Sequence, residues 1–423
     1  MNKPSSHVVQ TRLPNGFRIA TEAIAGAQTV AFAISVGVGA RYETMAQHGI
    51  SHLLEHMAFK GTPTHNARGL AEAFDLMGGN VNAYTSNEST VYYVKVLKNY
   101  AEEALQLLCD IVHKSIIDES ELERERGVIL QELAMHNDTP DDLVFDHFHA
   151  LAYTKQPLGR SILGTEDSIS THSRTDICDF IAQHYVPSRM VLTAAGAIDN
   201  ALCLRIANET FGVMPTQIAT PFSPAHYTGG TLVTYKKSLE QVQLVLGYQA
   251  CATTHKDTMA LRIFSILLGG GMSSRLFQEI REKRGLVYSI SAFASNYQDT
   301  GLLSLYAATG AEHLPELMPA LSDILAHAGE HISELELLRA KNQMKAGVVM
   351  ARESIGSIAE WMGRHLLTYG TIKTAEEILT EIDALTLLDM ERIANTYIGK
   401  SALTMAALGP VKSINHSILP QSV

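Results

Sequence analysis

The chain contains the stretch Gly49-Ile50-Ser51-His52-Leu53-Leu54-Glu55-His56-Met57-Ala58-Phe59, in which two histidines stand four residues apart. Residues four apart lie on one face of a helix, so His52 and His56 present two imidazoles side by side. The leucines and the methionine point elsewhere and can pack the helix into a core. With Glu55 at the edge of the histidine face, the order reverses the H-E-x-x-H zinc motif. The alternative is a helix with two structural histidines, and a third ligand elsewhere in the chain would distinguish the two.

Glu132 is the candidate for that third ligand. It lies in the otherwise apolar stretch 128–134, where a carboxylate is costly to bury unless it is paired or bound to a metal. A catalytic zinc ion takes three protein ligands and leaves one position open for water, and two histidines with one glutamate are such a set. We therefore expect His52, His56 and Glu132 to bind Zn²⁺.

Two further carboxylates complete the expected site. Glu125 lies two helical turns before Glu132 on the same face, so it can accept a hydrogen bond from either histidine. The alternative for Glu125 is a surface ion pair with Arg124 or Arg126. Glu55 remains as the general base, which would take a proton from zinc-bound water and pass it to the leaving amine. This chemistry is metal-assisted peptide hydrolysis.

Composition limits the class of protein. At 423 residues the chain exceeds the usual size of one hydrophobic core, so two or more domains are expected. The net charge of −11 argues against nucleic acid as the main partner. No targeting segment is visible and no apolar run reaches the length of a membrane span, so we expect a cytoplasmic protein without a membrane partner. The cysteines show no C-x-x-C spacing and are expected to be reduced, mostly buried thiols: Cys109, Cys178, Cys203 and Cys251.

The order of elements predicts an α+β fold in two halves. Residues 8–24 are predicted to form a hairpin around the turn Pro14-Asn15-Gly16. Residues 213–230 carry three prolines and two glycines and are interpreted as an interdomain linker. The linker separates a zinc-binding domain, residues 1–212, from a second α/β domain, residues 231–423. Further strands are expected at 29–36, 81–86, 89–96 and 190–195, and helices at 67–77, 99–114 and 118–133.

The second half of the chain repeats the first. Val81-Asn82-Ala83-Tyr84-Thr85-Ser86-Asn87 aligns with Ile290-Ser291-Ala292-Phe293-Ala294-Ser295-Asn296. At nearly the same offset, Ser120-Glu121-Leu122-Glu123-Arg124-Glu125-Arg126 aligns with Ser333-Glu334-Leu335-Glu336-Leu337-Leu338-Arg339. The second copy keeps the scaffold and lacks the candidate site, which favours a functional role for the site in the first copy. At these offsets His52 aligns with Leu261, His56 with Ser265, Glu125 with Leu338 and Glu132 with Lys345.

Five segments spread over both halves carry a family resemblance. They are His-Leu-Leu-Glu-His-Met-Ala-Phe-Lys-Gly-Thr (52–62), Gly-Gly-Asn-Val-Asn-Ala-Tyr-Thr-Ser (78–86), Glu-Arg-Gly-Val-Ile-Leu-Gln-Glu (125–132), Pro-Leu-Gly-Arg-Ser-Ile-Leu-Gly (157–164) and Arg-Glu-Lys-Arg-Gly-Leu-Val-Tyr (281–288). Together they resemble the insulinase/pitrilysin family of inverted-motif zinc peptidases, and within it the processing-peptidase β-subunits and their bacterial homologues. The family pattern assigns the zinc ligands, the base Glu55 and the supporting Glu125 as above.

The resemblance implies further site residues. Family members bind the substrate as an added strand on a sheet edge near the metal, and the matching segment is Asn82-Ala83-Tyr84. They also use an arginine and a tyrosine seven residues apart to hold and polarise the scissile peptide, and Arg281 and Tyr288 match this pair. Without the resemblance, these two would be interpreted as a surface charge and an ordinary strand residue.

The resemblance also implies an assembly. It predicts two duplicated α/β-sandwich domains that form half of a clamshell chamber, completed in a homodimer or, as the alternative, in a heterodimer with a metal-less homologue. The expected function is a zinc endopeptidase that acts on short unfolded or extended peptides. The alternatives are a structural subunit of the same fold and a peptide-binding dimer without turnover.

Overall fold

The computed structural model describes residues 8–421 and divides into two compact units. Unit 1 consists of the residues up to Ala134, Ser161–Ser223 and Met350–Ile372, and unit 2 of Met135–Arg160, Pro224–Val349 and the residues from Lys373 onward. Each unit combines one sheet with helices, so the expected α+β class with two α/β units is confirmed. None of the helices in residues 8–421 is long and apolar enough to cross a membrane.

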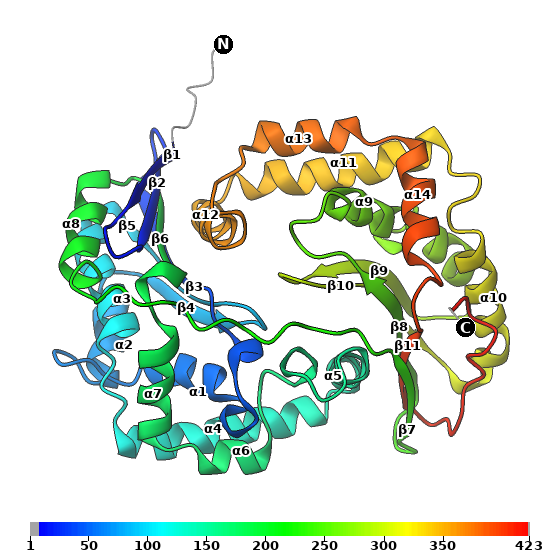
Figure 1. Cartoon of the computed structure of the whole chain (residues 1–423), viewed down its shortest axis with the longest axis horizontal. Helices are drawn as coiled ribbons and strands as arrows, with labels where there is room; N and C mark the ends of the chain where they lie inside the picture. The colour runs from blue at the N-terminus through cyan, green and yellow to red at the C-terminus, as the bar shows by residue number, and fades with distance from the viewer. Residues whose placement is uncertain (1–7, 422–423) are drawn as a thin grey trace. The chain divides into compact units, whose positions relative to one another are not determined.

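Unit 1 is built on a six-stranded sheet (Figure 1). All neighbouring strands are antiparallel except β2 and β6, which run parallel. The predicted hairpin at residues 8–24 is confirmed as β1 and β2, and β4 and β5 form a second hairpin at the other edge. In sheet order the strands are β1 (Val8–Arg12), β2 (Arg18–Ala23), β6 (Met190–Gly196), β3 (Thr29–Val36), β5 (Thr90–Leu97) and β4 (Asn80–Thr85).

The two faces of this sheet bury side chains of different size. Along β3, Phe32 and Ile34 belong to a large core shared with seven helices, whereas the alternating Ala31 and Ala33 face α12 (Ile355–Tyr369). Small side chains let α12 approach closely, and a Cβ at Gly363 would meet Ser35 Oγ at 2.5 Å. The seven helices are α1 (Ile50–Ala58), α2 (Ala67–Leu76), α3 (Ala101–His113), α4 (Glu119–Asn137), α6 (Glu166–Thr171), α7 (Arg174–His184) and α8 (Asn200–Thr210).

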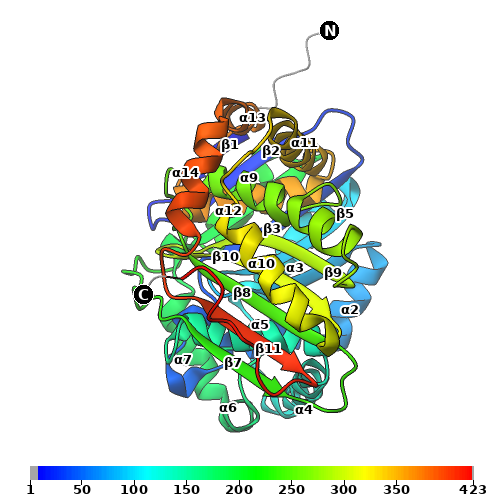
Figure 2. The ribbon, with the colours of Figure 1, turned by 90° about the vertical axis from the view of Figure 1, so that its right-hand side faces the viewer.

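Unit 2 is built on a five-stranded sheet with the same pattern of neighbours (Figure 2). β7 and β11 are parallel and the other pairs are antiparallel. In sheet order its strands are β7 (Gly230–Tyr235), β11 (Thr404–Gly409), β8 (Val242–Ala250), β10 (Gly301–Thr309) and β9 (Ser289–Asn296). Its helices are α5 (Pro140–Ala152), α9 (Thr258–Gly269), α10 (Leu314–Ala326), most of α11 (Glu334–Ala351), α13 (Ala375–Ala384) and α14 (Leu387–Tyr397).

The topology confirms the duplication. The order β2-β6-β3-β5-β4 of unit 1 corresponds to β7-β11-β8-β10-β9 of unit 2, and the aligned segments fall on β4 and β9 and on α4 and α11. The halves exchange one helix each. α5 comes from the first half of the chain and packs on β11 and β8 of unit 2, whereas α12 comes from the second half and packs on β3 and β6 of unit 1.

Because of this exchange, the two compact units are not the continuous domains that were expected from the sequence. The expected domains, residues 1–212 and 231–423, remain a proposal, because the compact units include segments 135–160 and 350–372 from the opposite halves. Residues 213–229 contain no helix or strand, in keeping with a connecting segment. All four cysteines are free thiols, and three of them are buried.

Candidate metal centre

Helix α1 is fixed at its N-terminus and along its apolar face. Glu43 accepts hydrogen bonds from the backbone N–H groups of Gly49 (2.8 Å) and Ser51 (2.9 Å), which would otherwise have no partner at the helix start. Gly49 has a φ of 86°, a conformation that favours glycine. Leu53 and Met57 are buried in the core, so the rotation of α1 is set by packing. The adjoining face, about 100° around the helix, then presents the two histidines.

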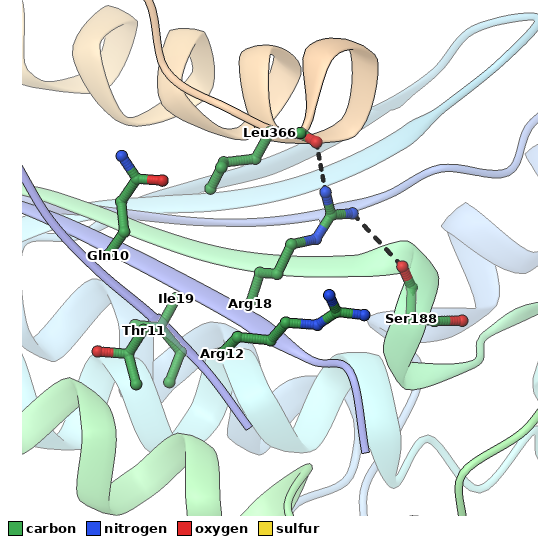
Figure 3. A pocket seen from close by; sticks show the side chains of 8 residues that line it. Gln10, Thr11, Arg12, Arg18, Ile19, Ser188 and Leu366 are labelled. Carbon is green, nitrogen blue, oxygen red and sulfur yellow. Dashed lines mark hydrogen bonds between the residues drawn. The ribbon is translucent and has the colours of Figure 1, made fainter. Parts of the chain in front are cut away.

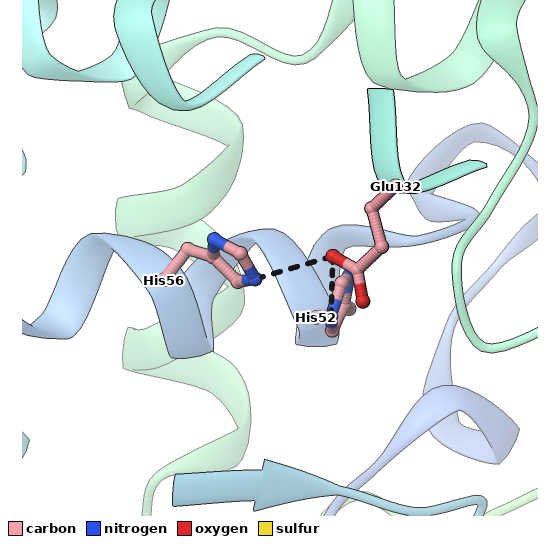
Figure 4. Close-up of side chains that lie close together, drawn as sticks. All are labelled: His52, His56 and Glu132. Carbon is pink, nitrogen blue, oxygen red and sulfur yellow. Dashed lines mark ion pairs between the residues drawn. The ribbon is translucent and has the colours of Figure 1, made fainter. Parts of the chain in front are cut away.

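Helix α4 brings a carboxylate to those histidines (Figure 4). Glu132 Oε2 lies 3.7 Å from His52 Nε2 and 3.6 Å from His56 Nε2. The three potential ligand atoms all lie within 4.8 Å of one another. Among residues 8–421, His52, His56 and Glu132 form the only such group of three or more.

The arrangement fits a zinc ion. The separations of 3.6 and 3.7 Å are too long for hydrogen bonds and suit atoms that each bind one ion at about 2.0–2.2 Å. Burial, together with the neighbouring His56, lowers the pKa of His52 to about 4, so its imidazole is neutral at pH 7. Neutral imidazole and ionised carboxylate are the forms that bind metal. The side chain of Glu132 is 37% exposed, which leaves this side of the cluster accessible.

Glu125 supports His56 rather than His52. Its Oε2 atom lies 3.0 Å from His56 Nδ1, so an N–H at Nδ1 leaves the Nε2 lone pair directed toward Glu132. Its Oε1 atom pairs with Lys60 Nζ at 2.7 Å. The surface ion pairs considered for Glu125 are absent, since Arg124 pairs with Glu121 and Arg126 with Glu123. The sequence did not lead us to expect a role for Lys60, although this residue lies four positions after His56.

Glu55 is positioned by a residue that sequence reasoning also missed. Thr85 Oγ1, at the end of β4, donates a hydrogen bond of 2.5 Å to Glu55 Oε2. Burial raises the pKa of Glu55, and the Thr85 hydrogen bond opposes that shift. One carboxylate oxygen is thereby held while the other has no such constraint. Thr85 lies directly after the predicted substrate segment, and this position is the feature of the sequence that could have identified it as a site residue.

The predicted substrate segment lies on an outer strand. β4 pairs only with β5, so its other edge presents backbone groups without strand partners within the described sheet. Asn82 and Tyr84 are exposed, whereas Ala83 between them is buried. The Tyr84 hydroxyl donates to Glu360 of α12 at 3.1 Å. The outer edge of β4 therefore has no neighbouring strand in the described sheet, as the prediction requires. The same strand contacts Glu55 through the Thr85 hydrogen bond.

Arg281 and Tyr288 lie close to each other in unit 2. Arg281 belongs to a π-helical segment, η6 (Phe277–Glu282), and its guanidinium carbon lies 4.8 Å from the centroid of the Phe277 ring and 5.8 Å from that of Tyr288. The Tyr288 side chain is strongly exposed, with 72% of the residue accessible. The histidines belong to unit 1, so a shared role in one reaction remains a proposal.

The corresponding position of unit 2 has other residues and other contacts. Leu261 and Ser265 are buried on α9, where the Ser265 hydroxyl donates to the carbonyl of Arg262 at 2.9 Å. Lys345 on α11 pairs with Asp383 at 2.7 Å. The second copy thus uses these positions for packing and a surface ion pair.

Comparison with known proteins places both halves in one family. The sequence model of the family described as insulinase (peptidase family M16) matches residues 18–166. The sequence model of the peptidase M16 inactive domain matches residues 171–344. An uncharacterized zinc protease of Rickettsia felis is 37% identical over 401 residues, covering 95% of this chain and 97% of the relative. A probable mitochondrial-processing peptidase subunit beta of Arabidopsis thaliana is 34% identical over 428 residues, covering 98% of this chain and 80% of the relative. A crystal structure of a protease from Helicobacter pylori has a TM-score of 0.87 at 25% identity and covers 96% of this chain and 100% of that one.

Proposed function

The chain belongs to the insulinase (M16) family of peptidases, and we propose that it is a zinc-dependent endopeptidase that hydrolyses short unfolded or extended peptides. The observation that carries this proposal is the convergence of His52, His56 and Glu132 beside Glu55. A structural role alone would not require two imidazoles and a carboxylate spaced for one ion.

The residues of the site have separate tasks in this proposal. His52, His56 and Glu132 would hold Zn²⁺, which supplies a Lewis acid and makes a water molecule more acidic. Glu55 takes a proton from the attacking water and delivers it to the nitrogen of the leaving amine. Glu125 keeps His56 oriented through Nδ1.

Substrate binding is proposed to use both units. The open edge of β4 would pair with an extended peptide along Asn82-Ala83-Tyr84, through main-chain hydrogen bonds that require no particular sequence. Arg281 and the exposed Tyr288 would hold the scissile peptide and donate to the developing oxyanion. Since one chain carries all of these groups, we propose a homodimer with an active site in each chain, enclosing the peptide in a chamber.

Peptide hydrolysis with and without a chelator tests the function. Purified protein should cleave a quenched fluorescent peptide of basic, unstructured sequence, lose that activity with a chelator and regain it with zinc. Activity that is indifferent to the chelator would exclude the proposed reaction. Peptide binding without any cleavage would instead identify a non-catalytic peptide-binding subunit.

Thr85→Val should lower kcat by about 10- to 100-fold, because a hydrogen bond to a charged group contributes about 1.5–3 kcal/mol. Thr85→Ser keeps the hydroxyl and should retain most of the activity. In a Glu55→Gln background, Thr85→Val should have little further effect, since Thr85 acts through Glu55. Steady-state kinetics of the four variants measure this. A larger loss in the serine variant than in the valine variant would show that the methyl group, not the hydroxyl, is needed.

A further inference from the structure

A pocket of unit 1 lies between the first hairpin and the end of α12 (Figure 3). Its volume is about 320 Å³, at the lower end of the range for small-molecule sites. The residues that line it are Arg12, Arg18, Gln10, Thr11, Ser188, Ile19, Leu366 and Gly370. No aspartate or glutamate is among these residues, although the chain as a whole has a net charge of −11.

The two arginines are forced together by the strand register. Arg12 and Arg18 are direct partners across the antiparallel pair β1–β2. Such partners have Cβ atoms about 4.5–5.5 Å apart, and like charges in this position destabilise a sheet. Figure 3 shows both guanidinium groups extending in the same direction from the hairpin. Burial, and to a smaller extent the repulsion from Arg12, lowers the pKa of Arg18. The hairpin therefore carries an electrostatic cost that no carboxylate in the pocket offsets.

Protein groups offset only part of this charge. Arg18 donates from Nη1 to the carbonyl of Leu366, in the last turn of α12, and from Nη2 to the carbonyl of Ser188 at 3.4 Å. A helix C-terminus carries about half a negative charge, which offsets only part of the two positive charges, and Arg12 is exposed to solvent. The Arg12 side chain makes no hydrogen bond or ion pair within residues 8–421. Its guanidinium donors are consequently available to a ligand.

We propose that this pocket binds the phosphate group of a small molecule between Arg12 and Arg18. A phosphate dianion matches the paired positive charges, and guanidinium groups bind phosphate oxygens through two parallel hydrogen bonds. Gln10 adds a polar side chain on the same face of β1 as Arg12. The volume exceeds that of phosphate alone and leaves room for an organic part beside Leu366. This site is separate from the metal residues and does not depend on the peptidase proposal.

Calorimetric titration of the full chain tests the proposal. The probes are inorganic phosphate, glycerol 3-phosphate and acetate, each at the same ionic strength in chloride buffer. We expect saturable binding of one phosphate per chain and weaker binding of the singly charged acetate. Tighter binding of glycerol 3-phosphate than of inorganic phosphate would assign a phosphate monoester as the ligand, and equal binding would assign free phosphate.

Matched variants identify the site. Arg12→Gln should weaken phosphate binding by about tenfold or more, because it removes one charge-assisted bidentate contact. Arg12→Lys should fall between this variant and the unchanged protein. Arg68→Gln removes an equally positive but exposed side chain of α2 and should bind as the unchanged protein does. Absence of saturable binding would overturn the proposal, as would equal losses in Arg12→Gln and Arg68→Gln. Far-ultraviolet circular dichroism should show that each variant is folded.

Discussion

Glu55→Gln is expected to lower kcat for peptide hydrolysis by about 10²- to 10⁴-fold while the protein still binds zinc. Glutamine has the same shape as glutamate but cannot take a proton from the attacking water. The three metal residues remain, because none of their contacts with one another passes through Glu55. Thr85 can still donate its hydrogen bond to the amide oxygen, so the local packing is retained.

Two measurements separate lost chemistry from lost structure in Glu55→Gln. Its zinc content should equal that of the unchanged protein, and it should bind the peptide with a similar Kd. Glu119→Gln, an exposed carboxylate in the first turn of α4, is the matched control and should keep full activity. A Glu55→Gln protein that cleaves the peptide at the normal rate would remove Glu55 from the role of general base.

Glu132→Gln should abolish zinc binding at concentrations that saturate the unchanged protein, and activity with it. The substitution replaces the only anionic member of the three-residue cluster by a neutral amide. We expect zinc affinity to fall by more than the roughly 10- to 100-fold that follows loss of a group supporting a ligand. Competition with a chelating zinc indicator measures this affinity independently of turnover.

The fold of the Glu132→Gln variant should be retained, because this side chain is partly exposed and packs at the surface of α4. Glu119→Gln again serves as the control on the same helix, with unchanged zinc affinity expected. If Glu132→Gln bound zinc as tightly as the unchanged protein, the third ligand would have to be another group.

Local patterns were sufficient to predict which helix presents the histidines. The spacing of His52 and His56 is a property of one helix. Glu132 was chosen because burying a carboxylate among apolar neighbours is costly, but its side chain is 37% exposed, so that premise was wrong. The partner of Glu125 could not be predicted, because the choice between the histidines depends on how α1 and α4 are rotated against each other. Lys60 and Thr85 were missed for the same reason.

The exchange of helices α5 and α12 between the two units could not be predicted from the sequence. α5 and α12 have similar lengths and each lies between well-marked elements, so nothing local states which sheet they cover. Their destinations are set by tertiary packing, such as the close approach of Gly363 to the small residues of β3. By contrast, the duplication was visible because β4 and β9 retain matching side chains.

Zinc titration of the metal-free protein, followed by the rate of peptide hydrolysis, tests the proposed peptidase most directly. The rate should rise in proportion to added zinc and reach a plateau at one zinc ion per chain, because the described residues contain one cluster of suitable ligands. Hydrolysis by the metal-free protein at the full rate, or no hydrolysis after one equivalent of zinc is bound, would contradict the proposal.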